Sequence, residues 1–255
     1  MFRPRVIPVL LLRNGGIVKT EGFGKQRYIG DPINAVRIFN DHRADELVFL
    51  DILATRERRL ISLDFVRDVG EEANMPFAVG GGIRSIQDIR SILSAGAEKV
   101  VINSFAAENP DFIAQAADSF GSSTITVCID VKAKRFGAPK TWTAGGTRAT
   151  AYAPEEFARV AEEKGAGELI VQSIQRDGTM AGYDLELINR VSRAVTIPVV
   201  ALGGAGGLDD LRRAYRETHA TGLAAGSMFV FHGPKRGVLI NYPDRAELKF
   251  LAGRP

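Results

Sequence analysis

The sequence has little of several features that would point to a particular class of protein. Among its 255 residues there are one cysteine and three histidines, and the net charge is only +3. No apolar run approaches the roughly 20 residues of a membrane-spanning helix, and the start of the chain lacks the apolar core of a signal peptide. We therefore expect a cytoplasmic protein that has no membrane partner.

The scarce residues also limit the chemistry. A single cysteine excludes an internal disulfide, and Cys128 lies in an apolar run, where we predict a small core residue. The histidines are scattered, without the spacing to cysteine or carboxylate pairs that a zinc site needs, so we expect neither a metal nor a cofactor. Basic and acidic residues are mixed along the chain. This pattern argues against a nucleic-acid partner and is compatible with small anionic ligands.

Short apolar segments rich in β-branched residues alternate with helical patterns along the chain. We predict strands at residues 5–12, 46–52, 76–81, 99–103, 124–131, 168–174, 197–203 and 221–226. Helix starts are indicated by Asp31-Pro32, Asn109-Pro110 and Pro154-Glu155-Glu156. Strands that are apolar nearly throughout, with helices between them, predict a parallel α/β fold, either a doubly wound sheet or a closed barrel.

An internal repeat favours the barrel. The stretches Val79-Gly80-Gly81-Gly82 and Leu202-Gly203-Gly204-Ala205-Gly206 each close an apolar run, and they lie roughly 120 residues apart. Two further small-residue segments, 99–104 and 222–227, follow them at nearly equal distances. We therefore predict one domain, residues 1–255, that forms a (β/α)8 TIM barrel from two half-barrels of about 1–122 and 123–255.

The ends of the predicted strands define the candidate site, because active sites of parallel barrels lie at the carboxyl ends of the strands. Glycine lets backbone amides approach phosphate oxygens, so the four small-residue turns predict two phosphate sites. The alternative is that these turns only connect strands to helices. Asp177 follows the sixth strand directly, and it either joins the second phosphate site or caps its own turn.

Two connections, residues 14–30 and 132–150, are longer than usual and occupy equivalent places in the two halves. Both are basic and contain glycines, which suits mobile flaps over an anionic ligand or, alternatively, solvated surface loops. Because Lys19 lies close after the first strand, we predict that it binds the ligand.

Together, the motifs Val79-Gly80-Gly81-Gly82-Ile83, Ile102-Asn103-Ser104, Arg176-Asp177-Gly178-Thr179 and Gly203-Gly204-Ala205-Gly206 resemble the cyclase subunit of imidazole glycerol phosphate synthase. The resemblance covers almost the entire chain. In that family a (β/α)8 barrel binds a substrate with a phosphate at each end, receives ammonia from a glutaminase subunit docked at its bottom, and closes the imidazole ring at its top. The resemblance implies one phosphate at Gly82, Asn103 and Ser104, and the other at or near Asp177, Gly204, Gly206, Gly226 and Ser227.

The family's chemistry uses two aspartates as general acid and base, at the ends of the first and fifth strands. By the resemblance Asp130 is the second of them, whereas Leu11 stands where the first is expected. Leucine neither gives nor takes a proton, and loss of a positioned acid–base group costs about 10²- to 10⁴-fold in rate. We therefore predict a poor cyclase. If another group replaces the missing aspartate, Asp51 is the nearest candidate.

Charged residues open four of the predicted strands: Arg5, Glu46, Lys99 and Glu168. The resemblance implies that they form a salt-bridged ring where ammonia enters; the alternative is a plug that only satisfies its own charges. Neutral ammonia crosses an apolar lumen at little cost, so a channel needs no acid–base group of its own. An intact entrance with a broken catalytic pair therefore predicts an ammonia conduit.

One branch of the family fits this description, the cyclase-like proteins of acetamidino-sugar pathways. The resemblance to it rests on Arg5-Val6-Ile7-Pro8, Val18-Lys19-Thr20 and Val238-Leu239-Ile240-Asn241-Tyr242-Pro243. In these pathways a glutaminase and the barrel supply ammonia to a separate amidotransferase that modifies a surface-polysaccharide sugar. We predict this role. The alternatives are a true cyclase of histidine biosynthesis, which makes imidazole glycerol phosphate and AICAR, and a phosphosugar isomerase on the same barrel.

Overall fold

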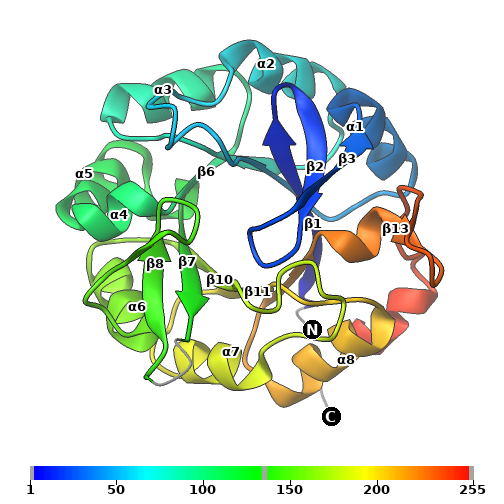
Figure 1. Ribbon diagram of the computed structural model, residues 1–255. Coiled ribbons are helices and arrows are strands. Elements are labelled where there is room, and N and C mark those ends of the chain that lie inside the picture. Colours follow the sequence, from blue (N-terminus) through cyan, green and yellow to red (C-terminus); the bar gives the residue numbers. More distant parts are fainter. Residues whose placement is uncertain (1–2, 134–136, 253–255) are drawn as a thin grey trace.

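Parallel strands close on themselves into a barrel in the computed structural model, which describes residues 3–133 and 137–252 (Figure 1). Each barrel strand pairs in parallel with the next, and the last pairs with the first. In spatial order they are β1 (Arg5–Arg13), β4 (Leu47–Asp51), β5 (Phe77–Gly80), β6 (Lys99–Ile102), β7 (Ile125–Lys132), β10 (Glu168–Ser173), β11 (Val199–Leu202) and β12 (Gly222–Ala225). The predicted (β/α)8 TIM barrel and its eight strands are confirmed, with strand ends within two residues of the predicted bounds.

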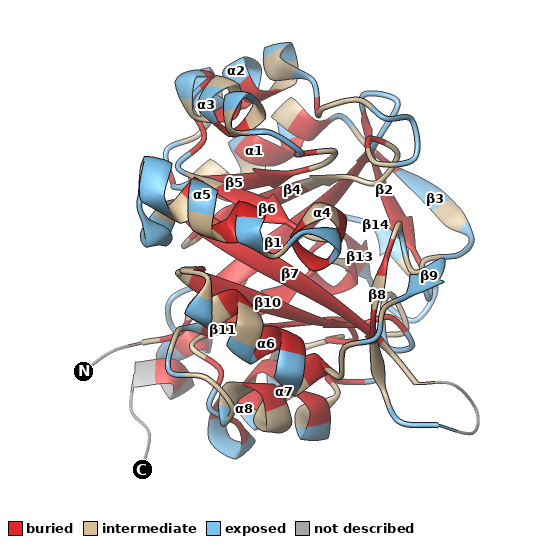
Figure 2. Cartoon of the chain, turned by 90° about the vertical axis from the view of Figure 1, so that its left-hand side faces the viewer, coloured by how far each residue is buried: buried red, intermediate tan, exposed pale blue. Residues whose placement is uncertain are grey.

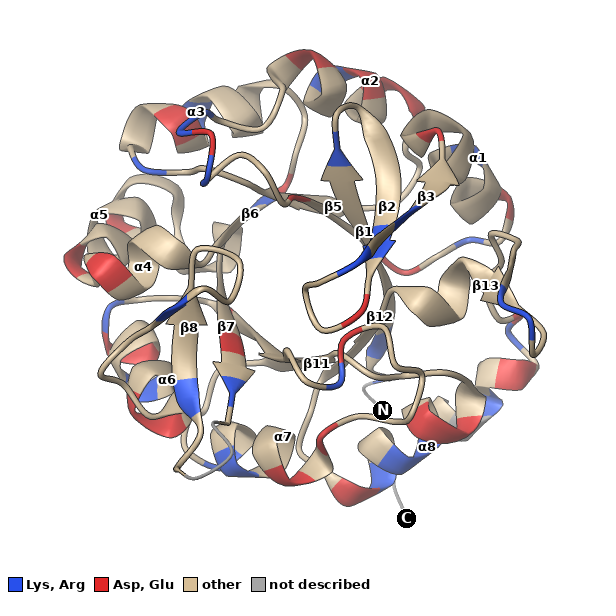
Figure 3. Ribbon diagram, viewed as in Figure 1, with Lys and Arg blue, Asp and Glu red and all other residues tan. Residues whose placement is uncertain are grey.

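Helices cover the outside of the barrel (Figure 1). They are α1 (Pro32–Asp41), α2 (Leu63–Glu72), α3 (Ile86–Ser94), α4 (Ser104–Glu108), α5 (Asp111–Phe120), α6 (Pro154–Glu163), α7 (Leu185–Ser192) and α8 (Leu208–Glu217). The predicted start signals are confirmed: the Asp31 carboxylate accepts from the Asn34 amide at 2.8 Å, and Pro154 is the first residue of α6. Figure 3 shows that acidic and basic residues are mixed over this outer layer of helices.

Strand alternation divides the apolar residues into two layers. In β1, Val6, Leu10 and Leu12 belong to the layer beneath the helices, whereas Ile7, Val9 and Leu11 belong to a second cluster. That cluster takes residues from every barrel strand and therefore fills the barrel interior: Ile7, Val9, Leu11, Val18, Val48, Ala78, Val101, Cys128, Ile170, Val200, Leu202 and Ala224. The burial colours of Figure 2 show the strands as the buried centre of the molecule. Cys128 is a buried core residue, as predicted.

Both long connections contain a β-hairpin, which the sequence did not predict. The hairpin β2 (Gly16–Thr20)–β3 (Gln26–Gly30) follows β1, and β8 (Lys140–Thr143)–β9 (Arg148–Ala149) follows β7. A third hairpin, β13 (Phe231–His232)–β14 (Gly237–Val238), follows β12. All three lie at the carboxyl ends of the barrel strands, at the right of Figure 2.

The carboxyl-terminal segment returns along the barrel to the opposite end. Tyr242 packs between Phe39 and Phe229, with ring centroids 6.4 and 5.5 Å away. Its hydroxyl donates to the carbonyl oxygen of Val6 at 2.9 Å and accepts from the amide of Asp45 at 3.3 Å. The irregular segment Asn241-Tyr242-Pro243 therefore anchors the chain beside the amino ends of β1 and β4, before the 3-10 helix η3 (Glu247–Ala252).

Within residues 3–133 and 137–252, no helix has the length and apolar character needed to cross a membrane.

We expect Tyr242→Phe to lower the free energy of unfolding by about 1–2 kcal/mol, because it leaves the buried Val6 carbonyl and Asp45 amide without their shared partner. Urea denaturation measures this. Tyr28→Phe is the matched control, since Tyr28 is 67% exposed and its change should stay within about 0.5 kcal/mol. Equal stability of the two variants would contradict the anchoring role.

Candidate functional site

A cavity of about 300 Å³ opens at the carboxyl ends of the barrel strands. Five of the predicted site residues line it together, from both halves of the chain: Leu11, Gly82, Asn103, Ser104 and Asp130. The other predicted ligand-binding residues, Lys19, Asp177, Gly204, Gly206, Gly226 and Ser227, do not line it. The residues of the first predicted phosphate site and the predicted acid–base position therefore line the same cavity.

The turn after β6 is tied to the hairpin that follows β7. The Ser104 hydroxyl accepts from the amide of Ala144 at 2.9 Å and donates to the Asn103 side-chain oxygen at 3.1 Å. The Asn103 amide group in turn donates to the Cys128 carbonyl oxygen at 2.9 Å. These contacts fix two polar side chains at the cavity wall and use the Ser104 hydroxyl proton, so the second N–H of the Asn103 side-chain amide is the donor suited to an anionic oxygen.

Gly82 is required by packing at this wall. Its φ is +73°, a left-handed conformation, and a Cβ added there would lie 1.8 Å from the Arg59 carbonyl oxygen. The tight connection between β5 and α3 thus explains this glycine by itself, and a role in binding phosphate is additional to it.

Asp130 is the acid–base candidate. It is buried on β7 and faces the interior, with the Cys128 thiol 3.5 Å from one carboxylate oxygen. Burial raises the pKa of Asp130 to about 7; donation by the Cys128 thiol opposes this shift, and repulsion from Asp177 adds to it. A carboxyl group with such a pKa is present in both protonation states near neutral pH, which suits proton transfer.

The position across the barrel from Asp130 is apolar. Leu11 on β1 pairs with Leu50 of β4 and belongs to the interior cluster. Asp51, the nearest candidate replacement, is engaged elsewhere: its carboxylate accepts from Arg59 at 2.5 Å and from the backbone amides of Leu53 and Ala54 at 3.0 and 3.2 Å. Asp51 is thus held in an ion pair, whereas Asp130 makes none with the described residues.

Some residues of the second predicted phosphate site make contacts within the chain. The Asp177 carboxylate accepts from the Thr20 hydroxyl at 2.6 Å and from the Gln172 amide at 3.3 Å. The Gly206 amide donates to Asp210 at 2.8 Å, and the Gly204 carbonyl accepts from Gly182 at 2.8 Å. Gly226 and Ser227 form the turn into the 3-10 helix η2 (Ser227–Phe229).

Lys19 points into the barrel beside this second site. Its ammonium donates to the Val9 carbonyl oxygen at 2.6 Å, and a Cβ added at Gly226 would lie 2.0 Å from its Nζ. Burial lowers the pKa of Lys19 to about 8, against the attraction of Asp177. The structure therefore brings Lys19 to the Gly226 turn rather than to the cavity.

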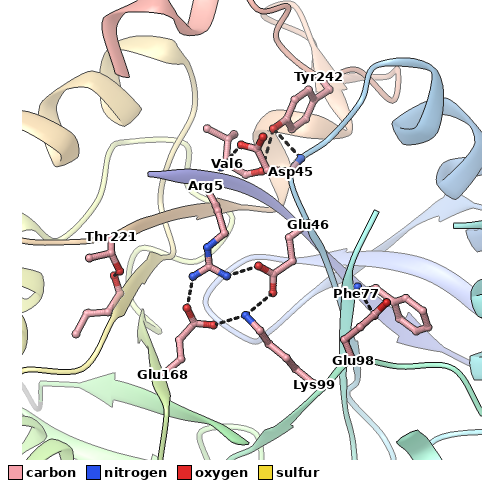
Figure 4. A network of polar contacts seen from close by, with 11 residues as sticks. Arg5, Val6, Asp45, Glu46, Phe77, Glu98, Lys99, Glu168, Thr221 and Tyr242 are labelled. Atoms are coloured by element: carbon pink, nitrogen blue, oxygen red, sulfur yellow. Dashed lines mark hydrogen bonds and ion pairs between the residues drawn. The ribbon is translucent and has the colours of Figure 1, made fainter. Parts of the chain in front are cut away.

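The predicted ring of charges is present at the amino ends of the strands (Figure 4). Arg5 bonds to both Glu46 and Glu168, and Lys99 lies 3.2 Å from a carboxylate oxygen of each. Each of the four side chains thus has two partners of opposite charge, and both glutamates are buried. The ring and the cavity lie at opposite ends of the apolar interior.

Several cavity residues were not singled out from the sequence, although the two hairpins lie in the connections predicted to cover a ligand. They come from the two hairpins, from the loops after β4 and β5 and from β10: Thr20, Phe23, Gln26, Arg56, Arg84, Ala144, Gly145, Thr147 and Gln172. Strand alternation could have identified Gln172, which follows Glu168 and Ile170 on the inward side. The hairpin residues carry no such signal.

No group of three or more histidine, cysteine, aspartate or glutamate side chains in the described part of the chain is arranged to hold a metal ion.

This protein is a parallel (β/α)8 barrel. A ring of charges lies at one end of the barrel, and a cavity around a buried aspartate lies at the other. Comparison with known proteins then gives the family: residues 5–234 match the model of the family described as histidine biosynthesis protein, and the chain belongs to that family.

Similar proteins carry matching names. A Leptospira interrogans protein provisionally named imidazole glycerol phosphate synthase subunit HisF is 43% identical, over 98% of this chain and 99% of its own length. Proteins named imidazole glycerol phosphate synthase subunit HisF from Caulobacter vibrioides and Alkaliphilus metalliredigens are 44% and 43% identical over 91% of this chain. These alignments cover 89% and 92% of the two relatives.

Asp130→Asn should remove a pH dependence of stability. Because the folded pKa of Asp130 is about 7 against an ordinary value of 3.8, the folded state binds more protons between these values, and stability falls as pH rises through them. We expect the melting temperature of Asp130→Asn, relative to wild type, to be higher at pH 8 than at pH 5. Asp118→Asn, at an exposed position, is the control. If the melting temperatures of the variant and of wild type differed by the same amount at both pH values, this would contradict a raised pKa of Asp130 in the folded protein.

Proposed function

We propose that this chain is the barrel subunit of a glutamine amidotransferase complex, in which it accepts ammonia from a glutaminase subunit and passes it on for acetamidino modification of a surface-polysaccharide sugar. One observation carries the proposal: an intact ring of charges lies at one end of an apolar interior, and at the other end lies a cavity in which leucine stands at one of the two expected acid–base positions.

We infer that the ring serves as the entrance for ammonia. Two cations and two carboxylates alternate around it, so its charges balance. Because each member has two partners, one contact can break without leaving a buried charge unpaired, which would be costly. A glutaminase docked at this end of the barrel would then release ammonia directly onto the ring.

The barrel interior favours neutral ammonia over ammonium. Its middle is filled by valine, isoleucine, leucine and alanine side chains and by Cys128. A charged ammonium ion would lose its hydration there, whereas ammonia would not carry a charge into the low-dielectric interior. This environment supports transfer without any proton exchange on the way.

Cyclisation in histidine biosynthesis is the second candidate, with imidazole glycerol phosphate and AICAR as products. It is favoured by the names of the relatives and by the pKa of Asp130, which lies near neutrality. Under this alternative, the ligand's phosphate would lie against Gly82, Asn103 and Ser104, and a group other than Leu11 would complete the proton transfer.

The ring predicts a measurable coupling. Glu168→Gln leaves Arg5 and Lys99 sharing only Glu46 as a carboxylate partner, so the entrance loses its charge balance. With a glutaminase partner, we expect wild type to stimulate glutamine hydrolysis and Glu168→Gln to reduce that stimulation about fivefold, which corresponds to about 1 kcal/mol. Glu186→Gln, on the exposed side of α7, is the matched control. Failure of the wild-type chain to change glutaminase activity would refute the proposal.

Leu11→Asp separates the two candidate functions. If the chain is a conduit whose cyclase pair is broken, restoring a carboxyl group opposite Asp130 should raise turnover of the cyclase substrate by about 10²-fold or more. Leu11→Asn introduces a side chain of nearly the same shape as aspartate but without a titratable proton, so it should not raise this turnover. If the chain is already a cyclase, Leu11→Asp should change turnover little.

A further inference from the structure

One buried hydroxyl in the barrel interior has no partner. Thr126 on β7 is 1% exposed, and its Oγ1 makes no hydrogen bond within the described residues. It lies on the same side of the strand as Cys128 and Asp130, because side chains two residues apart share a face. Cys128 belongs to the interior cluster, so Thr126 faces the interior as well.

Its neighbours place Thr126 between the ring and the cavity. In the sheet, Thr126 pairs with Glu168 of β10 on one side and with Val101 of β6 on the other. Glu168 is a member of the ring, while Val101 and Cys128 line the cavity. Thr126 is therefore level with the ring on the β10 side, and Cys128, two residues further along β7 or about 7 Å beyond it, lines the cavity.

We propose that the Thr126 hydroxyl is a transient binding site for ammonia inside the barrel, and this inference rests on the proposed conduit function. A hydroxyl both donates and accepts, so it can bond to the lone pair or to an N–H of ammonia. An unpaired buried hydroxyl is otherwise a cost to the fold that valine, with the same shape, would avoid. Bonding to a molecule in transit gives this polar group a partner without a permanent contact.

The chain offers a matched control for the missing hydrogen bond. Thr141 on β8 is also fully buried, and its Oγ1 is also without a partner in the described part of the chain. It pairs with Val131, which belongs to the layer beneath the helices, so Thr141 lies outside the barrel interior. Thr126→Val and Thr141→Val remove the same atom type from inside and outside the proposed path.

The functional test uses the complete complex of glutaminase, barrel and acceptor enzyme, supplied with ¹⁵N-amide glutamine and unlabelled free ammonium. We expect wild type to place mainly ¹⁵N in the product. Thr126→Val should lower the glutamine-derived share about two- to tenfold, the factor that an ordinary hydrogen bond is worth. Thr126→Ser and Thr141→Val should behave as wild type.

The outcomes distinguish a failure of the Thr126 site from a failure of the conduit function. An unchanged ¹⁵N share in Thr126→Val, with efficient transfer in wild type, overturns the Thr126 site and leaves the conduit standing. A wild-type product that draws its nitrogen from the free ammonium pool overturns the conduit and the Thr126 site together.

A second measurement needs no partner protein. With ¹³C-methyl-labelled threonine, the Thr126 methyl signal is followed as ammonium chloride is added at pH 9.5, where ammonia is abundant, and at pH 6.5, with sodium chloride as the ionic-strength control. We expect a saturable shift of the Thr126 signal at pH 9.5 only, and no shift of the Thr141 signal. An unmoved Thr126 signal would mean that the hydroxyl binds water alone, and it would overturn the proposal.

Discussion

The ring of four charged side chains is the interaction on which the rest of the structure depends. Two buried glutamates at the amino ends of β4 and β10 require cations, and Arg5 and Lys99 each reach both of them. The ring therefore joins strands from both halves of the chain at one level of the barrel. Above it the interior is apolar apart from the Thr126 hydroxyl, and buried charged groups return towards the carboxyl ends of the strands, with Lys19 and Asp130.

The two halves of the barrel have similar architecture but contribute different residues to the cavity. A hairpin follows the first and the fifth barrel strand, at equivalent places in the two halves. The turn of the first half with Asn103 and Ser104 lines the cavity, whereas the corresponding turns of the second half do not line it and lie beside Lys19 and Asp210. The same asymmetry places a carboxyl group on β7 and leucine on β1.

The sequence carried enough information for the barrel, because buried parallel strands are apolar runs that stop at polar or glycine residues. It also identified Arg5, Glu46, Lys99 and Glu168, since charge at the first residue of an apolar strand is conspicuous. It did not predict the hairpins, because β3 is short and mostly polar and becomes a strand only by pairing with β2. The inward position of Lys19 and the missing partner of Thr126 depend on three-dimensional neighbours that no local pattern encodes.

The central claim is that this barrel transmits ammonia and does not cyclise. Its most direct test is to supply the purified protein with saturating ammonia and the ribulosyl aminoimidazole carboxamide substrate of the ordinary cyclase, and to measure imidazole glycerol phosphate. The account predicts no turnover above background from protein that still stimulates a glutaminase partner. Turnover at the rate of an ordinary cyclase would contradict it and would identify the chain as an enzyme of histidine biosynthesis.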